Sequence, residues 1–196
     1  MTEEQQAVAR LKLGDLAGLE YLVKRYQVKA VHTAYLIVQD RTLAEDLAQQ
    51  AFINVYRKID QFDAGRPFGP WFLRSVVNDA LKAALREKRL IPIEDNGSSD
   101  HACSDEWLHD PSPLPEERME EEERCQIMRS ALLRLPPKQR AAIVLHYYLD
   151  FSEGELTGHF NRPLSTIKWW LRDGRQRLKT LLAQTLEEDP KSGGKQ

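Results

Sequence analysis

The chain has 196 residues, 41% of them hydrophobic, and a formal net charge of −2. This size suits one or two small globular domains, and two cysteines are too few for a disulfide scaffold. Apolar runs stay well short of the ~20 residues that cross a bilayer, and the first residues lack the basic start and apolar run of a secretory signal. We therefore expect a cytoplasmic protein that does not insert into membranes.

The low net charge hides an uneven distribution. Residues 91–123 contain twelve Asp and Glu and one basic residue, Arg118, whereas the rest of the chain contains 27 Lys and Arg and 18 Asp and Glu. The way charge is divided along a chain says more about its partners than the total does. The sequence therefore predicts two basic lobes joined by an acidic segment.

The first ninety residues have a helical pattern throughout. Gly14 ends a first short helix, and Asp15 is placed to cap a second one. We expect a separate third helix from Val28 to Val38. Thr42 and Glu45 have the spacing of a capping box, which would open a fourth helix with the wide apolar face of a bundle helix.

The segment Gln61–Gly69 interrupts this pattern, since its Asp, Gly and Pro residues favour a loop. From Pro70 to Arg89 the helical period returns, with polar and basic residues at steps of four on the outer face. They are Arg74, Asn78, Lys82 and Arg86. Cations in such a row can neutralise phosphates, and the amide of Asn78 can bond to a base edge. A single basic row is equally often just a solvated face.

Residues 91–123 predict a linker, because their prolines remove backbone donors and prevent a long helix or a central strand. Helix resumes after Pro115 and continues to a stop at Pro136 and Pro137. The linker and the start of the helix after it also hold His101, Cys103, His109 and Cys125. Their spacing matches no common zinc pattern, so we expect no metal site. Nor do the residues suggest a catalytic set or a cofactor site.

The last fifty residues predict a helix-turn-helix. Helical patterns at Lys138–Leu149 and Ser152–Phe160 precede a break at 161–164 and a helix from Ser165 to Leu182. The apolar positions expected to form one buried face of this last helix are Leu164, Ile167, Leu171 and Leu178, and its exposed basic row is Lys168, Arg172, Arg175 and Lys179. A helix with such an outer face is suited to the major groove of DNA.

These patterns predict an all-α fold of two small helical domains. The expected limits are 1–90 for an N-terminal helical bundle, 91–123 for the flexible acidic linker, 124–186 for the helix-turn-helix domain and 187–196 for a flexible tail.

Two blocks of residues resemble bacterial RNA polymerase sigma factors, and the length and layout resemble their extracytoplasmic-function (ECF) group. The resemblance covers about four-fifths of the chain. Residues similar to the second conserved region are Asp46-Leu47-Ala48-Gln49-Gln50-Ala51-Phe52, Phe68, Trp71-Phe72-Leu73-Arg74 and Asn78. Residues similar to the fourth region are Leu135-Pro136-Pro137-Lys138-Gln139-Arg140, Phe151-Ser152, Thr166-Ile167-Lys168, Arg175 and Leu178.

The resemblance implies binding to core RNA polymerase and promoter DNA, recognition of −35 and −10 elements, and DNA melting at transcription initiation. The implied polymerase contacts are Asp46, Leu47, Gln50 and Phe52, although a bundle would bury Phe52 in any case. The −10 element, with a base flipped out of the stack, would be received by the loop and the helix after it. The implied contacts there are Phe62, Asp63, Arg66, Phe68, Arg74, Asn78, Lys82 and Arg86. Trp71 either packs the loop or touches DNA.

The implied −35 contacts are Ser165, Thr166, Lys168, Trp169, Arg172, Asp173 and Arg175. Ser165 and Thr166 can cap the helix or bind phosphate. Trp169 can contact a thymine methyl, sugars or another protein, whereas Trp170 can close the core. Asp173 can accept from a cytosine, but an ion pair with Arg177 fits its spacing better.

The resemblance also implies an anti-sigma partner and a monomer when free. The acidic linker can mimic nucleic acid in a polymerase channel, screen the basic faces of the free protein, or only add solubility. Two other functions are compatible with the residues. One is a stand-alone helix-turn-helix regulator with an N-terminal sensor or dimerisation bundle, and the other is a helical protein-interaction module.

Overall fold

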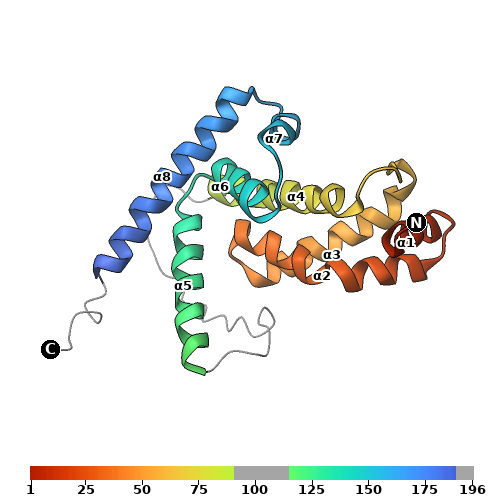
Figure 1. Ribbon diagram of the computed structural model, residues 1–196, viewed down its shortest axis with the longest axis horizontal. Coiled ribbons are helices and arrows are strands. Elements are labelled where there is room, and N and C mark those ends of the chain that lie inside the picture. The colour runs from red at the N-terminus through yellow and green to blue at the C-terminus, as the bar shows by residue number, and fades with distance from the viewer. Residues whose placement is uncertain (91–114, 189–196) are drawn as a thin grey trace.

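A computed structural model describes residues 1–90 and 115–188, and within these ranges the chain forms helices and no strand (Figure 1). The expected all-α fold is confirmed. None of the helices in these ranges is long and apolar enough to span a membrane.

The N-terminal bundle consists of α1 (Glu3–Lys12), α2 (Leu16–Val38), α3 (Arg41–Lys58) and α4 (Phe68–Leu90), with a short 3₁₀ turn η1 (Ile59–Gln61) after α3. The long helix α2 packs against the other three helices. Apolar side chains from all four helices are buried in the core between them. They include Val8, Leu22, Ile37, Val55, Phe72 and Val76.

Asp15 caps α2 as expected, since its Oδ1 accepts a hydrogen bond of 2.9 Å from the Ala17 amide. The expected break before Val28 is wrong, because α2 continues from Leu16 to Val38. Gln27 is a good helix former, and no glycine or proline occurs between Gly18 and Val38, so one helix can extend across the whole bundle.

The capping box at Thr42 and Glu45 is also wrong. Helix α3 begins at Arg41, two residues earlier than a Thr42 cap would place it, and Asp40 is its N-cap, with Oδ1 accepting from the Leu43 amide at 2.9 Å. Glu45 forms an ion pair with Arg41 at 2.9 Å instead. Asp is at least as good an N-cap as Thr, so the aspartate fixes where the helix starts.

The C-terminal domain consists of α5 (Pro115–Leu133), α6 (Pro137–Ile143), α7 (Glu153–Phe160) and α8 (Leu164–Glu188). Helix α6 continues into a π-helical turn, η2 (Val144–Tyr148). Ser152 and Glu155 form a capping box at the start of α7, and Asn161 ends it with a left-handed backbone, φ 49°. Helices α7 and α8 are the expected helix-turn-helix. Because α5 begins at Pro115, helical structure starts before the expected end of the linker at residue 123.

The two domains are in contact, and α6 lies beside α4 (Figure 1). Arg140 is 5% exposed, and its guanidinium donates to the carbonyl of Ile37 at the end of α2 and to Leu133 O at 2.7 Å. Burial lowers the pKa of Arg140 to about 10, so it remains a cation at neutral pH. A cation is stabilised at the negative end of a helix dipole, and so this buried arginine joins the two domains.

Candidate nucleic-acid interface

The loop between α3 and α4 is a short, ordered turn. Asp63 Oδ1 accepts from the Gly65 amide at 3.0 Å, and Asp63 Oδ2 lies 3.4 Å from Arg66 Nε. The side chains of Asp63 and Arg66 are 67% and 78% exposed. Both polar groups expected to receive the −10 element are therefore available on the surface, and the ion pair between them limits the movement of each side chain.

Phe62 and Phe68 flank this loop but do not offer a surface to a base. They are 3% and 1% exposed, and the Phe62 ring lies 5.7 Å from the Phe68 ring and 4.8 Å from the Trp71 ring. This packing contradicts the expectation that the two rings contact a base. Aromatic side chains next to a bundle gain more free energy from burial than from exposure. Both rings anchor the loop.

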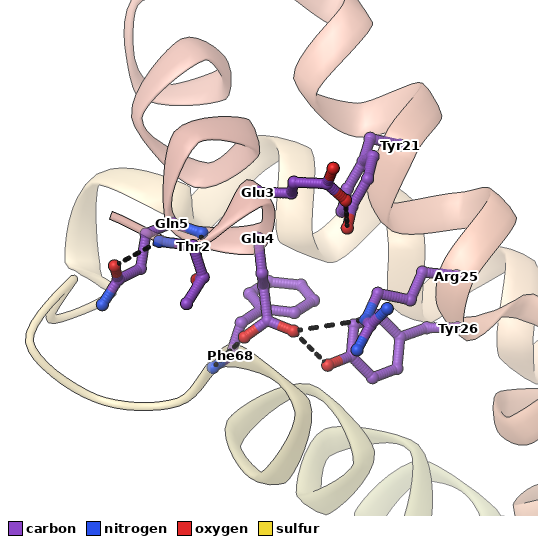
Figure 2. A network of polar contacts seen from close by, with 8 residues as sticks. All are labelled: Thr2, Glu3, Glu4, Gln5, Tyr21, Arg25, Tyr26 and Phe68. Carbon is purple, nitrogen blue, oxygen red and sulfur yellow. Dashed lines mark hydrogen bonds and ion pairs between the residues drawn. The ribbon is translucent and has the colours of Figure 1, made fainter.

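The amino-terminal helix holds both ends of the loop. Lys12 Nζ donates to Phe62 O at 2.6 Å, and Glu4 Oε1 accepts from the Phe68 amide at 3.2 Å. Figure 2 shows Glu4 between Phe68, Arg25 and Tyr26, with its second oxygen accepting from the Tyr26 hydroxyl. Burial, and then this bond to a carboxylate, raise the pKa of Tyr26 to about 12. Sequence patterns do not single out Glu4 and Lys12, since charged residues at the ends of a helix are ordinary.

A polar groove of about 270 Å³ lies between α3 and α4. Two of the expected −10 contacts, Asn78 and Lys82, line it together with Trp71. Lys82 forms an ion pair of 2.9 Å with Asp79. The α3 side of the groove adds Asn54 and Lys58, which sequence reasoning missed because they belong to a different helix.

The polar row on α4, which is Arg74, Asn78, Lys82 and Arg86, does not point in a single direction. A helix of 3.6 residues per turn advances by roughly 40° beyond a full turn at every fourth residue. Arg74, one turn before Asn78, faces the other domain, with its guanidinium 5.1 Å from the centre of the Phe151 ring. Arg86 is exposed. The structure thus groups Asn78 with Lys82 and separates Arg74 from them.

Burial and the nearby Arg74 both influence the pKa of His159 in α7. Burial, and then the positive charge of Arg74, lower the pKa of His159 to about 4. This imidazole is therefore neutral at physiological pH and adds no positive charge beside Arg74.

Helix α8 exposes Lys168, Arg172 and Arg175, as expected. Lys168 also lies 3.8 Å from Glu153 of α7. Ser165 and Thr166 are within the first turn of α8, not at its N-cap, because the helix starts at Leu164.

The expected buried face of α8 holds at three positions but not at the first. Ile167 and Leu171 are buried and Leu178 is partly buried, whereas Leu164 is 44% exposed. Leu164 is the first residue of the helix, where no neighbouring element covers it.

The sequence left the roles of three α8 residues undecided, and the structure shows the surroundings of each. Asp173 Oδ2 accepts from Arg177 Nε at 2.8 Å and from Gln139 Nε2 at 2.9 Å, which confirms the ion pair and occupies the carboxylate. Trp170 packs edge-on against Phe160, with ring centres 5.3 Å apart. Trp169 is 48% exposed and remains available to a ligand.

The expected polymerase-contacting face lies on α3. Asp46 and Gln50 are exposed there, and Leu47 is partly buried. Phe52 is 8% exposed, with its ring 4.5 Å from the Phe72 ring, so its role is in the core.

An apolar cavity of about 460 Å³ lies at the junction of the two domains, lined by side chains of α2, α5, α6, η2 and α8. Arg175 and the exposed Cys125 border it. Across the described ranges, no three His, Cys, Asp or Glu side chains are grouped as a metal site would need. His101, Cys103 and His109 fall outside those ranges.

Comparison with known proteins identifies the family of both domains. Residues 22–90 match the family model Sigma-70 region 2, and residues 125–178 match Sigma-70, region 4. The chain is 30% identical over 167 residues to the ECF RNA polymerase sigma-E factor of Escherichia coli strain K12, which covers 84% of this chain and 86% of that protein. The chain belongs to the ECF RNA polymerase sigma factors.

Other relatives agree with this assignment. The sigma factor is 29% identical over 180 residues to the ECF sigma factor SigW of Bacillus subtilis strain 168, covering 91% of this chain and 96% of SigW. Two solved structures share the fold at 20% identity. They are CnrH in complex with the cytosolic domain of CnrY, with a TM-score of 0.61 over 92% of this chain and 97% of that one, and the sigma factor RpoE with the anti-sigma factor NepR from Bartonella quintana, with a TM-score of 0.60 over 84% and 96%.

As a sigma factor of this group, the protein acts with core RNA polymerase, recognises −35 and −10 promoter elements and promotes DNA opening at transcription initiation. The alternative of a regulator with a sensor bundle is excluded, because the bundle itself matches region 2. Helix α1 lies before the matched residues.

Proposed function

We propose that this sigma factor binds the −10 element with the α3–α4 loop and the polar groove beside it. The observation that carries the proposal is that Asn78 and Lys82 of α4 face Asn54 and Lys58 of α3 across that groove. The groove thus has two amides, a tryptophan and two ammonium groups, one of which is paired with Asp79. This set suits a single strand, whose bases need an aromatic wall and edge contacts and whose phosphates need cations. Asp63 and Arg66 extend this surface onto the loop, and Arg86 extends it along α4.

Arg74 joins the −10 surface only when the domains separate, since Phe151 covers its guanidinium here.

We place the −35 contacts on the exposed face of α8. Lys168, Arg172 and Arg175 bind phosphates there, and Ser165 and Thr166 add donors in the first turn. Trp169 is an exposed apolar side chain on this face and contacts a thymine methyl. Asp173 positions Arg177 and Gln139 instead of reading a base.

The core polymerase docks on Asp46, Leu47 and Gln50 of α3. The functional division follows the expected limits, with residues 1–90 for the core and the −10 element and 124–186 for the −35 element. Two relatives were solved with partner proteins, one of them called an anti-sigma factor, and we infer that an anti-sigma partner regulates this chain too. The protein is not an enzyme, is a monomer when free and acts in the cytoplasm, where it meets the polymerase.

Transcription in vitro from a promoter library, with a cognate core polymerase, tests the proposal. The wild-type protein should produce transcripts that share two upstream motifs and are absent without it. Asn78→Ala and Lys58→Gln should each reduce these transcripts by about tenfold, the effect of losing one good base or phosphate contact. Reduced preference at a −10 position should accompany only Asn78→Ala.

Lys24→Gln is the matched control, because Lys24 is exposed on α2 and is ion-paired with Glu20. Full activity of Asn78→Ala and Lys58→Gln would show that the groove is not part of the −10 site. Equal loss in Lys24→Gln would show that any lost lysine weakens the protein, and would equally contradict the assignment.

A further inference from the structure

Helix α1 lies outside the region 2 match, yet it contacts the loop at both of its ends. Lys12, in the last turn of α1, bonds to the carbonyl of Phe62, where the loop starts. Glu4, in the first turn, bonds to the amide of Phe68, where α4 starts. We propose that α1 is a clamp that fixes the conformation of loop 62–67 for promoter opening, with Lys12 and Glu4 as its positioning residues. This inference rests on the proposed −10 role of the loop.

The contact at the end of the loop is a helix cap supplied from a distant part of the chain. The first amides of a helix have no partner within it, and a carboxylate is favoured there by the helix dipole. Phe68 is the first residue of α4, and Glu4 is 64 residues away in sequence. The Glu4 side chain is only 20% exposed, so this bond is shielded from water.

A second set of contacts fixes Glu4 itself. Its other oxygen accepts from the Tyr26 hydroxyl and lies 3.7 Å from Arg25 Nε (Figure 2). The Tyr26 ring in turn lies 5.6 Å from the Phe68 ring. A Cβ on residue 69 would stand 2.8 Å from the Tyr26 oxygen, so glycine is needed there for the tyrosine to reach Glu4.

The contact at the start of the loop is a hydrogen bond from a charged donor, which is stronger than a neutral one. The bond from Lys12 Nζ to Phe62 O is 2.6 Å long. Phe62 ends the η1 turn, and its ring is buried, so Lys12 orients the carbonyl of a residue that is already fixed on its other side. The loop backbone therefore leaves the bundle in one direction.

Between these two ends the loop's own bonds are short-range, and they include one from the Arg66 amide to Asp63 O at 3.0 Å. Asp63 accepts from the Gly65 amide and pairs with Arg66, and both charged side chains are largely exposed. A loop held in its binding conformation loses less entropy when DNA binds. Clamping at both ends thus raises the affinity for the opened strand without adding a contact to DNA.

The clamp is rigid enough for this role. Thr2 and Gln5 form a capping box that starts α1, and Ala7, Val8 and Leu11 are buried against α2. Movement of α1 would therefore have to disrupt the bundle.

The test separates loop positioning from folding and from polymerase binding. Holoenzyme is assembled with wild type, Lys12→Met, Lys12→Arg, Glu4→Gln and the control Lys24→Met, and open complexes are counted by permanganate reactivity of thymines. We expect Lys12→Met and Glu4→Gln to form about tenfold fewer open complexes, the factor for one lost hydrogen bond to a charged group. Core affinity should stay at the wild-type value, and the melting temperature should fall by only a few degrees, because the lost bond also stabilises the fold. Lys12→Arg should recover most of the loss of open complexes.

Hydrogen exchange on the free protein gives a second readout that does not depend on promoter function. Amides 63–67 should exchange faster in Lys12→Met than in wild type or Lys24→Met. Unchanged exchange together with unchanged opening would overturn the clamp, as would a parallel fall of opening, core affinity and melting temperature. Absence of open complexes with the wild-type protein would refute the proposed function, and exchange would then still decide whether α1 orders the loop.

Discussion

Gly18 allows α1 and α2 to approach until their backbones are almost in contact. A Cβ at this position would lie 2.3 Å from Ala7 O and 2.8 Å from Leu11 N. Both are backbone atoms and cannot rotate away. The glycine therefore sets the position of α1, and with it the contacts that α1 makes to the loop.

Gly18→Ala should lower the free energy of unfolding by about 1–3 kcal/mol, the usual cost of overpacking. Gly158→Ala in α7 is the matched control, because nothing lies within 4 Å of its would-be Cβ. In an open helical site alanine should stabilise by about 0.5–1 kcal/mol. Thermal unfolding followed by circular dichroism measures both, and shifts of the same sign would contradict the close approach.

Individual residues show where sequence patterns stop being informative. The spacing of Asp173 and Arg177 predicted their ion pair, because partners four apart on a helix meet without help from the rest of the fold. Phe62 and Phe68 were expected to face DNA and are buried. A phenylalanine in a loop has no periodicity to show which side faces the core, so only the packed structure decides.

At the scale of elements, local signals located most helices. Turn residues predicted the loop before α4, Gly14 and Asp15 marked the boundary between α1 and α2, and Pro136 and Pro137 marked the end of α5. The exact start of α3 was missed by two residues, because Asp40 and Thr42 both have capping chemistry.

Two alanine variants distinguish these caps. Asp40→Ala should destabilise the protein by about 1 kcal/mol, since the Leu43 amide loses its acceptor. Thr42→Ala should change stability by less than about 0.5 kcal/mol, as expected of an exposed surface residue. Urea unfolding measures the free energy of unfolding of both variants. A larger effect at Thr42 would indicate that Thr42 is the N-cap, as predicted from sequence.

At the scale of the whole molecule, the contact between the domains is incompatible with simultaneous binding of both promoter elements. Arg74 touches Phe151, and Glu153, two residues further on, lies 3.8 Å from Lys168. In the free protein these contacts therefore hold the proposed −35 surface of α8 close to α4. The −35 and −10 elements are about 25 base pairs apart, or roughly 85 Å of stiff duplex. The −10 and −35 contacts proposed above therefore require the domains to separate on the promoter.

Weakening the contact between the two domains should allow them to move apart in the free protein. Tyr148 bonds to His32 at 2.9 Å across the junction, so Tyr148→Phe combined with Phe151→Leu removes one hydrogen bond and one cation–π contact. Together these are worth about 1–2 kcal/mol. Small-angle X-ray scattering should then give a larger radius of gyration than for wild type. Tyr147→Phe, on a half-exposed neighbour, should leave the radius unchanged. Equal radii in all three proteins would show that these contacts do not hold the domains together.

Local sequence patterns were enough to predict the all-α fold, the helix-turn-helix and the family, because helix periods, caps and turn residues act over a few positions. The packed helices were needed to show that α1 reaches the α3–α4 loop, that α3 completes the groove with Asn54 and Lys58, and that Arg74 faces Phe151. Each of these contacts joins residues far apart along the chain. Their proximity follows from how amphipathic helices pack together, and no local pattern records it.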